Sequence, residues 1–96
     1  MKEVFRWLEG YENIYKISNF GKIISYARNK EGKVMCLKYD KDGYVKVNLS
    51  KNRCVKTYFV HRLVASSFVK STEKRHFVNH MNGKKDDNRA INLEWV

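Results

Sequence analysis

The sequence predicts an α+β domain in which an antiparallel β-meander, one short helix and a β-hairpin follow one another along the chain. Three observations support this prediction. Runs of β-branched and aromatic residues separated by turn residues fill 4–60, the apolar period becomes helical over 60–69, and alternation returns around an Asn-Gly turn within 76–96. A length of 96 residues suits one compact unit.

The strands of the meander are expected at residues 15–18, 22–26, 34–37, 44–49 and 55–60. Polar turns rich in glycine, asparagine or aspartate separate them. The run 44–49 alternates most clearly, which directs one set of side chains to the core and the other set to solvent. The core-facing set is Val45, Val47 and Leu49, and the opposite set is Tyr44, Lys46 and Asn48. Because aromatic residues make up 14% of the sequence, we expect an aromatic-rich core.

A helix of about ten residues is expected over 60–69, where the apolar residues have helical spacing and where His61 and Arg62 lie at the beginning. After this helix, residues 77–78 resemble a strand that leads to Asn79 and His80. A turn follows at Asn82-Gly83, the strongest two-residue turn signal. Alternation then returns at Ile91, Leu93 and Trp95. The tail is therefore predicted to form a wide hairpin with His80 near the end of its first strand.

The charge balance is strongly basic, with 20 Lys and Arg residues, 10 acidic residues and a net charge of +10. The basic residues are spread from Lys2 to Arg89, so a folded surface must present them. Such a surface favours nucleic acid as a partner, ahead of an anionic membrane. The plain alternative is a solvated shell that only keeps the protein in solution.

Other classes of protein are disfavoured by the sequence. No apolar run approaches the ~20 residues of a membrane span, and the N-terminal MKEVFRWLEG lacks the apolar region of a secretory signal. We therefore expect a cytosolic protein without a membrane partner. Cys36 and Cys54 form no Cys-x-x-Cys pair. They are expected to be reduced and partly buried, without a disulfide or a zinc cluster.

Three segments together carry a resemblance to a known family. They are WLEGYENIYKISNFGKIIS at 7–25, VHRLVASSF at 60–68 and VNHMNGKKDDNRAINLEWV at 78–96. The last two resemble the HNH motif of phage-type homing endonucleases, and the first resembles the small module that precedes this motif. The resemblance implies a β-rich, nuclease-associated DNA-binding module at 1–59 and an HNH motif at 60–96. It also implies a ββα-metal (His-Me finger) fold, with one divalent cation between a β-hairpin and a helix.

The resemblance assigns roles to residues of the hairpin. His80 matches the general base that activates water, Asn79 matches a metal ligand, and Asn92 matches the central asparagine that braces the loop and orients the histidine. His61 matches a position expected to be structural or to contact DNA. The chemistry suits these residue types, because a histidine with an ordinary pKa of about 6.5 accepts a proton near neutral pH. The implied cofactor is Mg²⁺ or Mn²⁺, which stabilises charge on the phosphate, with no structural zinc.

Two departures from the family pattern bear on activity. Asn79 stands where some relatives carry an acidic residue, and an uncharged amide should hold Mg²⁺ more weakly. The family's second metal ligand lies on a helix after the final strand, and the sequence to Val96 has no counterpart of that helix. A homodimer or a partner chain is one possible source of it. His76 and His80 have the spacing of a helical zinc pair, but the strand-like residues between them argue against that alternative.

The expected DNA contacts are basic residues on the meander, on the helix and in the loop after His80. They are Lys46, Arg53, Lys56, Arg62, Lys84, Lys85 and Arg89. Three hypotheses follow: a nicking, metal-dependent DNA endonuclease, an inactive HNH-derived DNA-binding or regulatory module, and an interaction protein whose charge is incidental. Metal-dependent cleavage separates the first from the second, and salt-sensitive DNA binding separates the second from the third.

Overall fold

The computed structural model describes residues 1–71 and 75–96 as two antiparallel sheets, a helix and a C-terminal hairpin. The first sheet, in the order β1-β2-β3-β4, contains β1 (Phe5–Trp7), β2 (Tyr15–Ser18), β3 (Ile23–Ser25) and β4 (Lys33–Val34). The second contains β5 (Lys38–Tyr39), β6 (Val45–Lys51) and β7 (Cys54–Phe59). The helix α1 (Val60–Phe68) follows, and the hairpin consists of β8 (Val78–His80), the 3-10 helix η1 (Ala90–Asn92) and β9 (Leu93–Trp95). This arrangement confirms the predicted α+β fold and its single α-helix.

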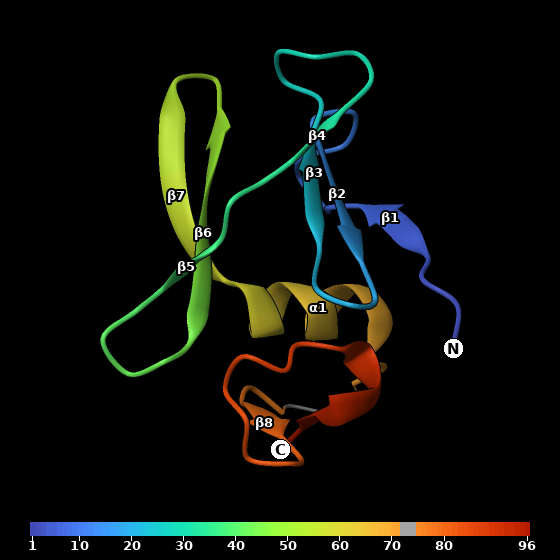
Figure 1. The fold of residues 1–96 in the computed structure, drawn as a ribbon, viewed down its shortest axis with the longest axis vertical. Coiled ribbons are helices and arrows are strands. Elements are labelled where there is room, and N and C mark those ends of the chain that lie inside the picture. Colours follow the sequence, from blue (N-terminus) through green and yellow to red (C-terminus); the bar gives the residue numbers. More distant parts are fainter. Residues whose placement is uncertain (72–74) are drawn as a thin grey trace.

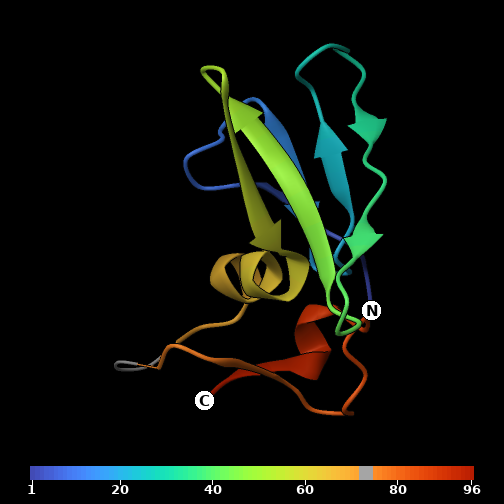
Figure 2. The ribbon, with the colours of Figure 1, turned by 90° about the vertical axis from the view of Figure 1, so that its left-hand side faces the viewer.

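Helix α1 lies between the strands of the two sheets and the C-terminal hairpin (Figure 1, Figure 2). It contacts β2, β6 and β7 as well as β8, η1 and β9. Val60, Val64 and Ala65 are fully buried on it, as the helical spacing requires. The indole of Trp95 donates a hydrogen bond to the carbonyl of Val69 just beyond the helix (3.0 Å), which ties the hairpin to the helix end. The helix therefore fixes the hairpin relative to both sheets.

The predicted continuous meander is divided into two sheets. Where we expected one strand at 34–37, β4 ends at Val34 and β5 begins at Lys38 in the other sheet. Met35 still donates its backbone N–H to Ile23 (2.9 Å), and its side chain packs against the core together with that of Leu37. The linking segment thus packs alternate side chains against the core as a strand does. It is not a strand because the chain passes here from the first sheet to the second.

Strand β1 was not predicted from the sequence. All three of its residues are exposed, so it lacks the alternation of a half-buried strand. It is an edge strand, and its conformation depends on pairing with β2, where Phe5 lies opposite Ser18 and Trp7 opposite Lys16. The alternation in β6 is confirmed, since Val45, Val47 and Leu49 are buried.

The core is aliphatic, not aromatic-rich as expected. Tyr15 is the one aromatic residue among the buried hydrophobic side chains of the described residues, while Tyr11, Tyr58, Phe68 and Trp95 are half-buried at the edge of the core. The expectation for the cysteines is also corrected, because Cys36 and Cys54 are free and exposed. Cys36 lies in the link between β4 and β5, and Cys54 lies at the end of a tight turn, so neither reaches the interior.

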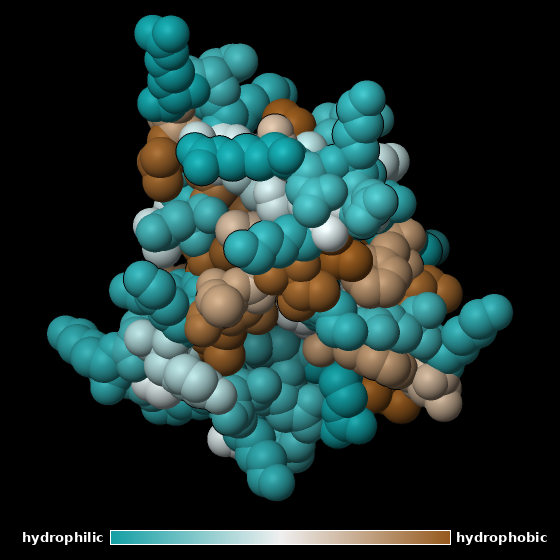
Figure 3. All heavy atoms as spheres, turned by 45° about the horizontal axis from the view of Figure 1, so that its top comes forward, coloured by the Kyte–Doolittle hydropathy of each residue, from teal (hydrophilic) through white to brown (hydrophobic). Residues whose placement is uncertain are grey.

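No helix within the described ranges is long and apolar enough to cross a bilayer. Viewed from the side of the sheet turns, the surface is mainly hydrophilic, with apolar side chains gathered across the middle of the face (Figure 3). This mixed surface agrees with the excess of basic residues in the sequence.

Candidate active site

His80 is the last residue of β8 and lies opposite Leu93 of β9. Its side chain is 8% exposed, so it points into the molecule. The preceding residue, Asn79, is exposed and lies opposite Glu94, as expected for neighbours whose side chains alternate along a strand. The hairpin therefore presents an inward imidazole and an outward amide at adjacent positions.

His80 belongs to a group of four aromatic rings that pack together, which we call the ring cluster: Tyr44, Phe59, His61 and His80. The rings of His61 and His80 are closest, with centroids 4.9 Å apart and planes inclined by 51°. Tyr44 lies 5.3 Å from His61 and 6.0 Å from His80, and Phe59 lies 5.6 Å from His61. Each ring comes from a different part of the chain, namely the residue before β6, the end of β7, the beginning of α1 and the end of β8.

His61 is a buried neutral histidine. It is 8% exposed, and its Nδ1 has no hydrogen-bond partner among the described residues. The pKa of His61 is lowered to about 4, mainly by burial and further by the electrostatic influence of His80 and Arg62, while Asp40 partly opposes this shift. At neutral pH, His61 therefore packs against His80 without adding charge to the site.

Asn88 is a residue of this site that the sequence prediction missed. Its Oδ1 lies 2.9 Å from Nε2 of His80, and its side chain is 6% exposed. Asn88 stands in the polar run Asp86-Asp87-Asn88, where no periodicity distinguishes the buried residue from its exposed or half-exposed neighbours. Its role becomes visible only when the loop is folded against His80.

Asn92 is 7% exposed and links the two limbs of the loop that follows His80. Its Nδ2 donates to Oδ1 of Asn82 (3.0 Å) and to the carbonyl of Asp87 (2.9 Å), and its Oδ1 accepts from the backbone N–H of Asn82 (3.1 Å). These bonds suit the bracing role that the resemblance implies. The bond to the His80 ring comes from Asn88.

Asn79 is the candidate metal ligand, and Glu94 orients its amide. Nδ2 of Asn79 donates to Oε2 of Glu94 (3.0 Å), which turns Oδ1 away from that carboxylate. Amide and carboxylate oxygens are hard donors that suit Mg²⁺ or Mn²⁺. In 1–71 and 75–96 there is no group of three or more His, Cys, Asp and Glu residues placed to hold a metal ion. The donor chemistry thus fits a cation that keeps most of its waters.

Two of the predicted DNA-binding residues lie beside the ring cluster. Lys46 lies opposite Phe59 in the β6–β7 register and opposite Lys38 in the β5–β6 register. Lys85 donates to the carbonyl of Asp42 (2.9 Å), and its ammonium lies 5.0 Å from the Tyr44 ring centroid. Lys38 was missed because the predicted strand 34–37 ended before it.

The other predicted contacts are more dispersed. Lys56 lies opposite Leu49, hence on the other face of the β6–β7 ribbon from Lys46, and Arg53 occupies the turn at its tip. Arg62 donates to the carbonyl of His76 (2.8 Å) and lies over the Trp95 ring at 5.8 Å. Lys84 is exposed in the loop.

Arg89 is engaged by a neighbouring carboxylate. Its Nε and one terminal nitrogen bind the two carboxylate oxygens of Asp87 at 2.8 and 2.7 Å. These bonds hold the pKa of the Asp87 carboxyl well below its ordinary value. The Asp87 carboxylate therefore compensates much of the positive charge of Arg89, one of the residues predicted to bind DNA.

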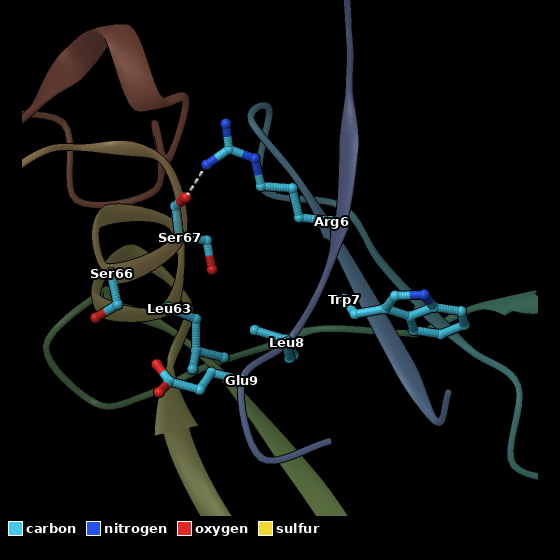
Figure 4. A pocket seen from close by; sticks show the side chains of 7 residues that line it. All are labelled: Arg6, Trp7, Leu8, Glu9, Leu63, Ser66 and Ser67. Carbon is cyan, nitrogen blue, oxygen red and sulfur yellow. Dashed lines mark hydrogen bonds between the residues drawn. The ribbon is translucent and has the colours of Figure 1, made fainter. Parts of the chain in front are cut away.

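A separate cavity lies between β1 and α1 (Figure 4). Arg6 on one side donates a hydrogen bond to the carbonyl of Ser67 on the other. None of the predicted site residues lines this cavity. The candidate site is instead the surface formed by the hairpin, the ring cluster and the adjoining lysines.

Comparison with known proteins agrees with this geometry. The family profile of the NUMOD4 motif matches residues 3–50. DNA endonuclease I-HmuI of Bacillus phage SP01 is 42% identical over 89 residues, which are 93% of this chain and 49% of that protein. The uncharacterized HNH endonuclease L245 of Acanthamoeba polyphaga mimivirus is 46% identical over 82 residues, which are 85% of this chain and 24% of that protein.

The structural comparison gives the same result. A solved structure described as DNA binding and cleavage by the HNH homing endonuclease I-HmuI superposes with a TM-score of 0.86 at 39% identity, covering 97% of this chain and 52% of that one. The fold and the histidine-bearing hairpin thus define a homologue of the HNH homing endonucleases, which confirms the resemblance found in the sequence. The chain belongs to the family defined by the NUMOD4 motif, and it spans about half the length of I-HmuI.

Proposed function

We propose that this chain carries the DNA-binding surface and the general base of an HNH endonuclease, with DNA as its substrate. The observation that supports this most directly is the inward imidazole of His80 at the end of a hairpin strand. It occurs in a chain 42% identical to a DNA endonuclease. His80 takes a proton from a water molecule, and the water oxygen attacks phosphorus. The bond to the leaving oxygen breaks, and that oxygen takes a proton from solvent.

Asn79 is proposed to contribute its Oδ1 to one divalent cation. A bound Mg²⁺ or Mn²⁺ would stabilise negative charge on the phosphate and on the leaving oxygen. The hydrogen bond from Nδ2 of Asn79 to Glu94 supports this role, because it turns the amide oxygen away from the Glu94 carboxylate. An uncharged ligand binds such a cation weakly, so substrate phosphate and waters complete its coordination.

The DNA backbone is proposed to follow the face that carries Lys38, Lys46 and Lys85. Lys38 and Lys46 lie directly opposite each other, and like charges at such positions destabilise a sheet. An anionic partner removes that repulsion. Lys46 adjoins Phe59 and Lys85 adjoins Tyr44, so both lie next to the rings around His80. A phosphate path over this face therefore leads toward the proposed base.

The second candidate function is DNA binding without cleavage. It is favoured by the sparse donor set, because the described residues include no group of three or more possible metal ligands and Asn79 is the candidate ligand of the hairpin. In this case the chain occupies DNA and regulates access to it, or a second copy or a partner chain supplies the remaining ligand.

A plasmid-nicking assay separates the two functions. Supercoiled DNA is incubated with wild type, His80→Ala and His76→Ala in Mg²⁺ or Mn²⁺, with EDTA as the metal-free arm. His76→Ala is the matched control, since His76 is an exposed histidine outside the ring cluster. Metal-dependent nicking that is lost in His80→Ala and kept in His76→Ala supports the nuclease. A salt-sensitive gel shift without nicking supports the binding module.

A further inference from the structure

We infer that Asn88 is a positioning residue that fixes the tautomer of His80, an inference that rests on the proposed role of His80 as general base. The β2–β3 turn of the N-terminal module holds Asn88 in place. The proton acceptor is then Nδ1 of His80. The inference makes the N-terminal module part of the catalytic geometry as well as of the DNA-binding surface.

The tautomer follows from the hydrogen bond between the two side chains. Nε2 of His80 lies 2.9 Å from Oδ1 of Asn88, and both side chains are buried. An amide oxygen can only accept a hydrogen bond, so Nε2 must carry the proton. In a neutral imidazole the other nitrogen then has the lone pair. Nδ1 is therefore the atom that can take a proton from water.

The ring cluster opposes a flip of the imidazole. The rings of His61 and Tyr44 pack against that of His80, with centroids 4.9 and 6.0 Å away and planes inclined by 51° and 39°. A half-turn of the His80 ring about its Cβ–Cγ bond would replace Nε2 by a carbon at Asn88. The buried amide oxygen would then lose its partner, which is unfavourable for a buried polar group.

Asn88 is itself fixed from two directions. On one side, the carbonyl of Asp87 accepts from Asn92 (2.9 Å). On the other side, the N-terminal module contributes a backbone bond from the N–H of Ala90 to the carbonyl of Asn19 (2.7 Å). The asparagine therefore lies between the brace of its own loop and the β2–β3 turn.

Gly21 in the β2–β3 turn is where the two parts of the chain come closest. A Cβ atom added to Gly21 would lie 3.2 Å from Cβ of Asn88 and 3.5 Å from its carbonyl oxygen. The side-chain oxygen of Ser18, the fully buried last residue of β2, accepts from the backbone N–H groups of Phe20 and Lys22 in this turn, both at 3.1 Å. The turn is thus rigid, and the absence of a side chain at Gly21 allows Asn88 to reach His80.

Two glycines offer a matched pair for testing this contact. Gly21 and Gly10 have nearly the same backbone angle, with φ of +89° and +85°, so alanine brings similar backbone strain to each. A Cβ at Gly10 would meet nothing within 4 Å, whereas a Cβ at Gly21 meets Asn88. Any difference between the two variants at His80 therefore reports the contact with Asn88.

The test is ¹⁵N NMR of the His80 ring combined with single-turnover nicking. In wild type we expect a protonated Nε2 and an unprotonated Nδ1. In Asn88→Leu the preference should be lost, and the single-turnover rate constant at saturating protein should fall by about 100-fold, the lower range for a general base. The protein concentration that gives half of this rate should change little. Asn88→Asp keeps an acceptor and should recover most of both losses. Gly21→Ala should shift the His80 ring signals, whereas Gly10→Ala should leave them in place.

The ring signals decide the inference even without cleavage. A proton on Nδ1 in wild type, or an unchanged preference in Asn88→Leu, overturns it. Equal effects of Gly21→Ala and Gly10→Ala overturn the role of the β2–β3 turn. If Asn88→Leu fails to fold, the wild-type spectrum still identifies the protonated nitrogen. Nicking that survives His80→Ala overturns the proposed function instead, because the tautomer is measured independently of activity.

Discussion

The imidazole rings of His61 and His80 lie 4.9 Å apart, centroid to centroid, although one begins helix α1 and the other ends strand β8. Both rings are buried, and two protonated imidazoles at this distance would repel each other. The pKa of His61 is lowered mainly by burial and further by His80, so stability in mild acid is a direct test of the ring cluster.

The first prediction concerns stability in mild acid. The pKa of His61 is lowered to about 4 in the folded protein, below the ordinary 6.5, so the unfolded chain binds more protons between these values. The contribution of neutral His61 to the free energy of unfolding is present above pH 6.5. It is lost as the pH falls toward 4, and the total loss is about 3 kcal/mol. Urea unfolding at several pH values measures it. In His61→Leu this dependence should disappear, and a wild-type curve that is flat from pH 6.5 to 5 contradicts the prediction.

The second prediction concerns the opposed lysines Lys38 and Lys46. Lys46→Glu should stabilise the fold by about 0.2–1 kcal/mol, because it replaces repulsion by attraction across the β5–β6 pair. The same variant should weaken DNA binding and reduce the salt dependence of the affinity. Lys56→Glu, on the other face of the ribbon, is the control and should affect binding less. Equal losses of affinity would place the DNA elsewhere.

The third prediction compares Arg89 with Lys46 in DNA binding. Both carboxylate oxygens of Asp87 bind Arg89. Removing Arg89 should therefore change the slope of log affinity against log salt concentration by less than the value of about one expected for a phosphate contact. Lys46→Ala should change it by about one unit. Gel shifts over a range of salt concentrations measure both slopes. A full unit lost in Arg89→Ala would show that DNA displaces Asp87.

The fourth prediction concerns the metal ligand. Asn79→Asp should lower the stability of the metal-free protein, because the new carboxylate faces Glu94, which now accepts from the amide of Asn79 at 3.0 Å. A charged ligand should also bind Mn²⁺ more tightly, so the rise in Tm on adding Mn²⁺ should exceed that of wild type. Asn79→Leu should show no metal-dependent rise. A larger rise in Asn79→Leu than in Asn79→Asp would exclude position 79 as the ligand.

Sequence reasoning reached the candidate site only in part. Asn79, His80 and Asn92 could be identified from the strand-like run and from the match to the motif, because both signals lie within a few neighbouring residues. Glu94, Asn88 and Lys38 were missed. Glu94 lies opposite Asn79 across a wide loop whose register the Asn-Gly turn does not fix. Asn88 contacts His80 and Lys38 lies opposite Lys46 through loops without a periodic pattern, and Asn88 also depends on its approach to Gly21 of the distant β2–β3 turn.

By itself, the sequence determined the α+β class, the helix that begins at residue 60, the alternation in β6 and the histidine-bearing hairpin. These features depend on periodicity and turn chemistry, which act over a few neighbouring residues. Only the tertiary structure decided the division of the meander, the aliphatic core, the edge strand β1 and the contact of Gly21 with Asn88. Each of these features depends on which segments pack against each other although they are far apart in the chain. The free energy of the whole fold determines that packing, and local patterns do not.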